Sequence, residues 1–221
     1  MGRHKTPSGE RLRAALAFRA LRQDTGLSYY QLSKSYLRET DPKKYEEMLR
    51  VPNRFRRYSR GETPKSREGR DRLTWSMKRS DLFRSTYESP LFVLLQMKGD
   101  SRALKRFSLK AQSSHLIARS VRPLSRWAVF GIPGELENLT ACTHIDALCL
   151  LLLCFRMQVG KEDESMCAIA CVDWFRAWSK AMQDREIELL MLNALTDHVP
   201  QLSPYLQELH LGLTADSNLK M

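Results

Sequence analysis

Apolar residues recur at helical spacing along most of the chain. Between Glu10 and Gln23, alanine, phenylalanine and leucine return every three or four positions among arginines, and Gly26 follows as a C-terminal stop. Ser28 then begins a second helix, because Gln31 completes a capping box with it. This helix is expected to run to Leu37. This pattern predicts that the chain is helical from near its start.

Two similar signals mark the beginnings of further helices. Asp41 before Pro42 combines an N-cap with a proline in the first turn, and it predicts a short helix over residues 43–50. Thr63 before Pro64 repeats the signal. We therefore expect these two residues to cap the next helix.

A compact helix is expected between those two starts, over residues 54–60, with Asn53 as its N-cap and Gly61 as its end. At about 100° per residue, Phe55, Tyr58 and Ser59 fall on one side. The opposite side carries Asn53, Arg56, Arg57 and Arg60, with Arg54 on the flank. The pattern predicts that the aromatic side packs inward and that the basic side faces solvent.

The second half of the chain keeps the helical period and becomes more apolar. Helices are expected over residues 91–97, 102–109, 112–121, 136–157, 187–198 and 203–211. The clearest amphipathic stripe consists of Cys167, Ala170, Cys171, Trp174, Phe175, Trp178 and Met182. The whole pattern predicts an all-α fold with a domain boundary near residues 80–89. We expect a flexible arm over 1–9, a basic domain over 10–80 and an α-helical domain over 81–221.

Charge divides the chain into two parts. Residues 1–127 hold 30 Lys and Arg against 12 Asp and Glu, a net charge of +18, whereas residues 128–221 hold 6 against 13, a net charge of −7. Clustered cations bind polyanions by releasing condensed counterions. The first part is therefore expected to bind nucleic acid, although solubility or attraction to an anionic membrane surface would also explain a basic segment.

Other features of the composition narrow the class of protein. The longest unbroken apolar run, Ala147 to Phe155, covers nine residues, well short of the roughly 20 that a membrane-spanning helix needs. The N-terminus lacks the apolar stretch of a secretory signal. The five cysteines all follow residue 141 and make no disulfide framework. We expect a cytoplasmic protein with no membrane segment.

One segment resembles a known family. Leu27, Ser28, Leu32 and Ser33, followed by Arg60, Gly61, Glu62, Thr63 and Pro64, resemble the phage-repressor type of helix-turn-helix protein over about 60 residues. The resemblance implies a five-helix DNA-binding domain that places a recognition helix in the major groove. The connection before the arginine helix is about 15 residues long, not the usual three or four. Either the extra helix over 41–50 is an insertion, or its lysines belong to the binding face.

The candidate binding residues follow from this interpretation. Arginine forks match guanine or phosphate oxygens, and asparagine can pair with adenine. The nucleic-acid-binding candidates are Asn53, Arg54, Arg56, Arg57, Arg60, Lys43, Lys44 and Lys65, with secondary phosphate contacts from Arg102, Lys105 and Arg106. The alternative is a solvated helix whose arginines pair with carboxylates such as Glu46, Glu47 and Glu62.

Metal binding and catalysis have weaker support in the sequence. Cys142, His144, Cys149 and Cys154 invite a zinc interpretation, but the paired spacing of structural zinc sites is missing and apolar helices surround these residues. Neither a glycine-rich phosphate loop nor a known hydrolase motif is present. We expect neither an enzyme nor a cofactor.

The aromatic residues Trp174, Phe175 and Trp178 are expected to form either a subunit interface or simply a core. The main hypothesis is a prokaryotic or phage-type transcriptional regulator that binds double-stranded DNA through its basic helix. Its C-terminal domain would then oligomerise or bind a partner protein. One alternative is an accessory subunit of a larger nucleoprotein complex for defence, transposition or replication, which would contact DNA or RNA. Another is an adaptor for acidic proteins.

Overall fold

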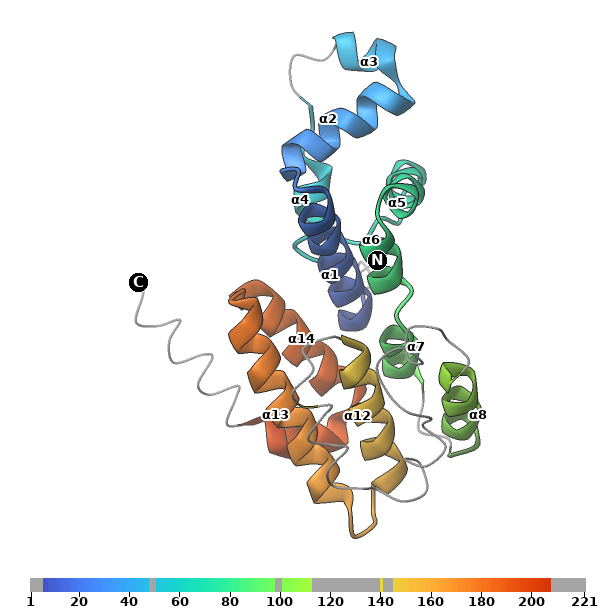
Figure 1. Cartoon of the computed structure of the whole chain (residues 1–221), viewed down its shortest axis with the longest axis vertical. Helices are drawn as coiled ribbons and strands as arrows, with labels where there is room; N and C mark the ends of the chain where they lie inside the picture. The colour runs from blue at the N-terminus through green and yellow to red at the C-terminus, as the bar shows by residue number, and fades with distance from the viewer. Residues whose placement is uncertain (1–5, 48–50, 98–100, 113–139, 141–144, 208–221) are drawn as a thin grey trace, which may run out of the picture. The chain divides into compact units, whose positions relative to one another are not determined.

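The computed structural model describes residues 6–47, 51–97, 101–112, 140 and 145–207 (Figure 1). Every regular element in these ranges is a helix, which confirms the all-α prediction. The chain divides into two compact units, Met1–Glu88 and Ser89–Met221. Across the described ranges, we find no helix with the length and apolar character that crossing a membrane requires.

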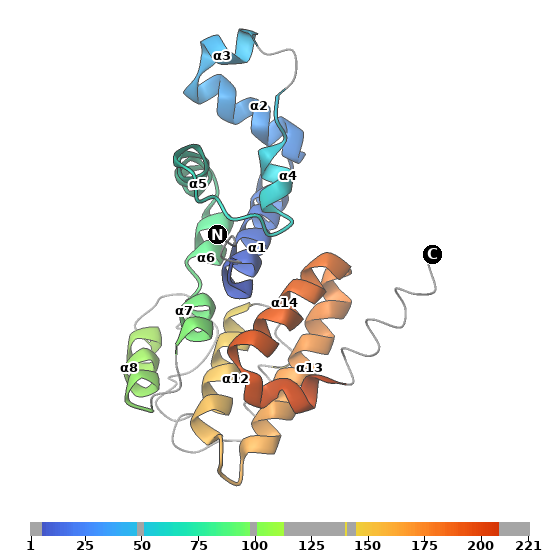
Figure 2. The same ribbon diagram turned by 180° about the vertical axis from the view of Figure 1, so that it is seen from behind.

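The described residues of the first unit form six helices. They are α1 (Ser8–Thr25), α2 (Tyr29–Thr40), α3 (Pro42–Glu47), α4 (Arg54–Tyr58), α5 (Arg67–Arg79) and α6 (Asp81–Tyr87). α1 and α6 pack side by side, and α2 contacts both α3 and α4, as the two opposite views show (Figures 1 and 2). Because α6 packs against α1, the segment over 81–87 belongs to the first unit and not to the C-terminal domain.

Local signals explain where the first helices begin and end. Gly26 follows α1 with a φ of 65°, a left-handed conformation that glycine adopts without strain. Ser28 and Gln31 form both bonds of the predicted capping box at the start of α2. The prediction for α5 was wrong, because Ser66 caps this helix and not Thr63 or Pro64. The Ser66 hydroxyl accepts a hydrogen bond from the Gly69 amide at 3.0 Å.

Aromatic side chains fill the core of the first unit. Phe18 of α1 lies between three other rings, with ring centroids 5.7 Å from Phe55, 4.9 Å from Tyr58 and 5.0 Å from Phe83. These rings come from α4 and α6 as well as α1. The short helix α4 is therefore anchored by two buried aromatic residues, although a helix of this length would not be stable alone.

Replacing Gly69 with alanine is expected to destabilise the first unit. A Cβ at this position would lie 2.9 Å from the backbone C and Cα atoms of Pro64, which cannot move without shifting the turn before α5. We expect a loss of about 1–3 kcal/mol, as overpacking usually causes. An exposed helical glycine would instead gain stability on this change. Urea unfolding of G69A beside the exposed control K78A distinguishes the two, and a more stable G69A would contradict the steric explanation.

The second unit is built around α12 (Ile145–Gln158). The other elements in the described residues of this unit are α7 (Pro90–Gln96), α8 (Ser101–Gln112), α13 (Glu164–Met182), α14 (Arg185–His198) and a 3-10 turn (Pro200–Leu202). α12 packs against α7, α8 and α13, and its residues are buried on all sides from Ile145 to Leu153. The predicted helix over 112–121 and the first part of the one over 136–157 lie mostly outside the described residues.

The aromatic stripe of α13 is part of this core. Trp174, Phe175 and Trp178 are 0%, 1% and 2% exposed, and the two indole rings stack with centroids 5.7 Å apart. α13 packs along α12, so these side chains face the interior of their own unit. They therefore do not form the exposed interface patch that we considered from the sequence.

Candidate nucleic-acid interface

The net charge of the chain belongs to the first unit. Residues 1–88 hold 22 Lys and Arg against 11 Asp and Glu, whereas residues 89–221 hold 14 of each. The whole net charge of +11 therefore falls on the first unit, and the second unit is neutral. The sequence suggested a division of charge at residue 127. Residues 89–127 lie on the basic side of that division, but they belong to the second unit.

The two sides of α4 differ as the helical period predicts. Phe55, Tyr58 and Ser59 are 0%, 4% and 3% exposed. On the opposite side, Arg56, Arg57 and Arg60 are exposed. Asn53 and Arg54 are half-buried. The helix is shorter than expected, because it ends at Tyr58 and Arg60 lies in the turn that follows. α4 therefore presents arginines from a fixed position on the core.

Asn53 already has a structural role. Its side-chain oxygen accepts a hydrogen bond from the Arg56 amide at 3.3 Å and caps the N-terminus of α4. A bidentate contact to adenine would need that same oxygen as an acceptor. A contact from Asn53 to a base would therefore have to share this oxygen with the cap, so Asn53 holds α4 in place besides being a candidate contact.

The candidate cations differ in their partners. Arg57 pairs with Glu62 at 2.5 Å, so the predicted alternative of local ion pairs holds for this arginine. Lys65 pairs with Glu10 at 3.4 Å, a partner that the sequence did not suggest. Arg60 also interacts with another group. By contrast, the side chains of Lys43 and Arg56 make no hydrogen bond or ion pair within the described ranges, and both are exposed. These two cations are open to an external anion.

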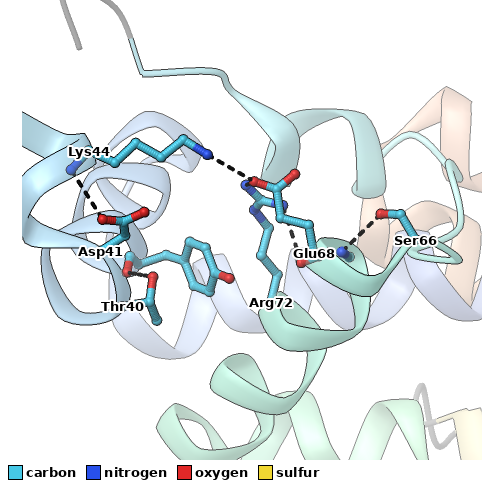
Figure 3. A network of polar contacts seen from close by, with 8 residues as sticks. Thr40, Asp41, Lys44, Ser66, Glu68 and Arg72 are labelled. Carbon is cyan, nitrogen blue, oxygen red and sulfur yellow. Dashed lines mark hydrogen bonds and ion pairs between the residues drawn. The ribbon is translucent and has the colours of Figure 1, made fainter. Parts of the chain in front are cut away.

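Lys44 pairs with a carboxylate that the sequence did not single out. The Nζ atom of Lys44 lies 3.8 Å from Oε1 of Glu68, and Nη2 of Arg72 donates to the same oxygen at 3.1 Å (Figure 3). The hydrogen bond from Arg72 lowers the pKa of Glu68, and the charges of Arg72, Lys44 and Arg54 lower it further, against the opposing effect of burial. Three helices thus direct cations at one carboxylate.

Arg72 is the buried member of this group. It is 5% exposed, its guanidinium lies 4.8 Å from the centroid of the Tyr36 ring, and its Nη1 donates to the Glu68 carbonyl at 3.2 Å. Burial raises the pKa of Tyr58, while the neighbouring Arg72 opposes that rise. The i, i+4 spacing of Glu68 and Arg72 was visible in the sequence. Their meeting with Lys44, Arg54 and Tyr36 was not.

Cations over aromatic rings are unusually frequent in the first unit. The pairs are Arg13 with Tyr87, Arg22 with Tyr29, Lys34 with Tyr30, Arg38 with Tyr45, Arg72 with Tyr36 and Arg79 with Trp75. Significant cation–π contacts occur roughly once per 70–80 residues in protein structures. Tyr30 is also 43% exposed. The other five rings are buried or half-buried, so among these pairs Tyr30 is the ring suited to stacking with a nucleic-acid base.

The secondary candidates lie on α8 of the second unit. Arg102, Lys105 and Arg106 are exposed, and the same helix buries Leu104 and Phe107. Arg102 and Lys105 have interactions of their own. These three residues therefore belong to a different compact unit from α4. The basic surface of the first unit does not include them.

The described cysteines have the character of core residues. Burial raises the pKa of Cys154 to about 12 and raises that of Cys149 and Cys171 as well. These side chains are therefore neutral thiols, poorly suited as nucleophiles or metal ligands. No group of three or more His, Cys, Asp or Glu side chains in the described part is arranged to hold a metal ion. Cys142 and His144 lie outside that part.

None of the protein-family models, curated protein sequences or solved structures compared with the chain matches it. The resemblance to phage-repressor helix-turn-helix proteins therefore depends on the residues that suggested it.

Proposed function

We propose that this protein is a DNA-binding regulator of prokaryotic or phage type that binds double-stranded DNA through its first unit. The observation that carries the proposal is that the whole net charge of +11 lies in this unit, with arginines held outward by a helix whose other side is buried. Arg56 contacts phosphate directly, and Arg57 exchanges Glu62 for phosphate. Each phosphate contact releases counterions, so binding weakens as salt rises.

A short helix limits how the protein reads sequence. α4 has five residues, so few of its side chains can reach base edges in the major groove at once. We therefore assign Arg56, Arg57 and Arg60 mainly to the phosphate backbone. Contacts of this kind fix the position of a protein on the duplex and carry little sequence information. The second unit then supplies self-association or a partner contact through a surface other than the buried tryptophans of α13.

One observation favours a second candidate. The exposed Tyr30, whose ring centroid lies 4.9 Å from Nζ of Lys34, suits stacking with an unpaired base better than contact with a closed duplex. An accessory subunit of a nucleoprotein complex that contacts single-stranded RNA would use such a surface. Binding selected from a random duplex pool and from a single-stranded RNA pool, run in parallel, decides between the two candidates.

The double variant R56A/R57A is expected to bind duplex DNA about tenfold more weakly than the unchanged chain. Loss of two phosphate contacts should also reduce the slope of log affinity against log salt by up to about 1.8. Fluorescence anisotropy over a salt series measures both quantities, and circular dichroism checks that the helices are retained.

R176A/K180A is the matched control, because it removes two exposed cations from α13 of the second unit. It should leave the salt slope unchanged. Equal losses in the two double variants would mean that net charge alone matters and would remove α4 from the interface.

A further inference from the structure

Two cations contact the Glu68 carboxylate in the first unit, and the charge of a third acts on it. Lys44 comes from α3, Arg54 from α4 and Arg72 from α5. Glu68 itself lies in the first turn of α5, where the helix dipole also favours a negative charge. The arrangement is therefore suited to an anion, and in the free protein a side chain of the same chain supplies it (Figure 3).

The cationic side of this arrangement does not depend on the carboxylate. Arg72 is also held by the Glu68 main-chain carbonyl and by the Tyr36 ring. An arginine keeps its positive charge even when it is buried, so this position retains a need for an anion. The carboxylate is different, because the Glu68 side chain is 51% exposed and its partner Lys44 is 47% exposed. Exposed ion pairs of this kind exchange easily with other anions.

We propose that Lys44 and Arg72, with the charge of Arg54 adding to theirs, form a binding site for one nucleic-acid phosphate, which the Glu68 carboxylate occupies until the phosphate replaces it. The inference rests on the proposed function and adds a specific contact with a built-in competitor. Nη2 of Arg72 and the mobile ammonium group of Lys44 each offer a donor to one of the two free oxygens of a phosphodiester. No covalent step is involved.

The site also accounts for the extra helix before the arginine helix. α3 carries Lys44 to the N-terminal end of α5, where Glu68 lies. The segment that departs from the usual helix-turn-helix spacing thus contributes a cation to the same phosphate as Arg54. In this arrangement α3 is part of the interface.

The test is a variant that binds more tightly. E68Q keeps an oxygen that can accept from Arg72 and removes the competing charge, so we expect it to bind duplex DNA about threefold to tenfold more tightly than the unchanged chain. E46Q is the matched control, because Glu46 is an exposed residue of α3 with the same charge and no side-chain partner among the described residues. The control should change affinity by less than about twofold.

A second comparison locates the gain. In the E68Q background, K44A should abolish the increase in affinity, whereas K43A, one position earlier and without a partner in the described ranges, should leave most of it. If E68Q melts at a lower temperature by circular dichroism, K44A and K43A are compared in the unchanged chain, where K44A should weaken binding more.

The outcomes separate this inference from the proposed function. If the unchanged chain binds neither duplex DNA nor single-stranded RNA, the proposed function fails and this site fails with it. If the chain binds DNA and E68Q is no tighter than E46Q, the phosphate site is overturned while the proposed function stands. Equal effects of K44A and K43A would overturn it in the same way.

Discussion

Replacing Arg156 with methionine is expected to destabilise the second unit by about 2–4 kcal/mol, because charged hydrogen bonds to buried carbonyls are lost together. Nη1 of this arginine donates to the carbonyls of Leu94 at 2.7 Å and Met97 at 3.0 Å, and Nη2 donates to that of His198 at 2.7 Å. Burial lowers the pKa of Arg156, yet an arginine remains charged under all ordinary conditions.

Those carbonyls lie at the C-terminal ends of two helices. α7 ends at Gln96 and α14 ends at His198, where main-chain oxygens have no partner within their own helix. A single guanidinium on α12 therefore closes two helix ends, and its charge is favourable beside the negative ends of both helix dipoles. Methionine has a similar length but donates no hydrogen bond, so all three oxygens would lose the arginine donor. The Leu94 oxygen would keep its hydrogen bond from the Met97 amide.

Hydrogen exchange measured by mass spectrometry checks this prediction within the full chain. Peptides from α7, α12 and α14 should exchange faster in R156M, while those from α1 and α6 serve as an internal reference. R156K should recover part of the protection, since lysine keeps the charge without the fork. R176M is the control, because the Arg176 side chain is 52% exposed and pairs with Asp173. Equal protection in R156M and R176M would contradict the role given to Arg156.

Local signals predicted the elements of the first unit well. The capping box of Ser28 and Gln31, the stop at Gly26 and the cap at Asn53 depend on residues a few positions apart, and all three are present. The start of α5 was misplaced because Thr63–Pro64 and Ser66 both carry capping signals. In the structure Ser66 caps the helix, and Pro64 lies close to Gly69 in the turn before it.

The candidate interface was predictable only in part. The division of α4 into an aromatic and a basic side follows from the helical period, and the structure has it. The convergence of Lys44, Arg54 and Arg72 on Glu68 depends on how α3, α4 and α5 pack, and no local spacing contains that information. Charge counts along the sequence treated Glu68 as one acid among many, whereas the structure places it among the cations.

The stripe on α13 shows a related limit. A periodic run of tryptophan, phenylalanine and cysteine indicates that one side of a helix is covered, but it does not say by what. Here α12 of the same unit packs against that side, and Trp174 is fully buried. A stripe of this kind predicts burial, and the identity of the covering surface has to come from the fold.

Replacing Phe55 with alanine is expected to cost the first unit about 3–5 kcal/mol, the usual loss for a buried phenylalanine. Phe55 is fully buried, and its ring centroid lies 5.7 Å from both Phe18 and Trp75 and 6.2 Å from Tyr36. These contacts join α4 to α1, α2 and α5. Faster hydrogen exchange in α1 and α2, with α12 as the internal reference, measures the loss.

The same variant separates anchoring from charge at the proposed interface. F55A changes no cation, but it removes the contacts that hold Arg56 and Arg57 in place, so DNA affinity should fall together with stability. R56A/R57A should lower affinity while stability stays within about 0.5 kcal/mol, as exposed substitutions usually do. F55L fills most of the cavity and should restore both properties in large part. If F55A lost stability and kept full affinity, the binding surface would lie elsewhere in the chain, because phosphate contacts from α4 require a fixed helix.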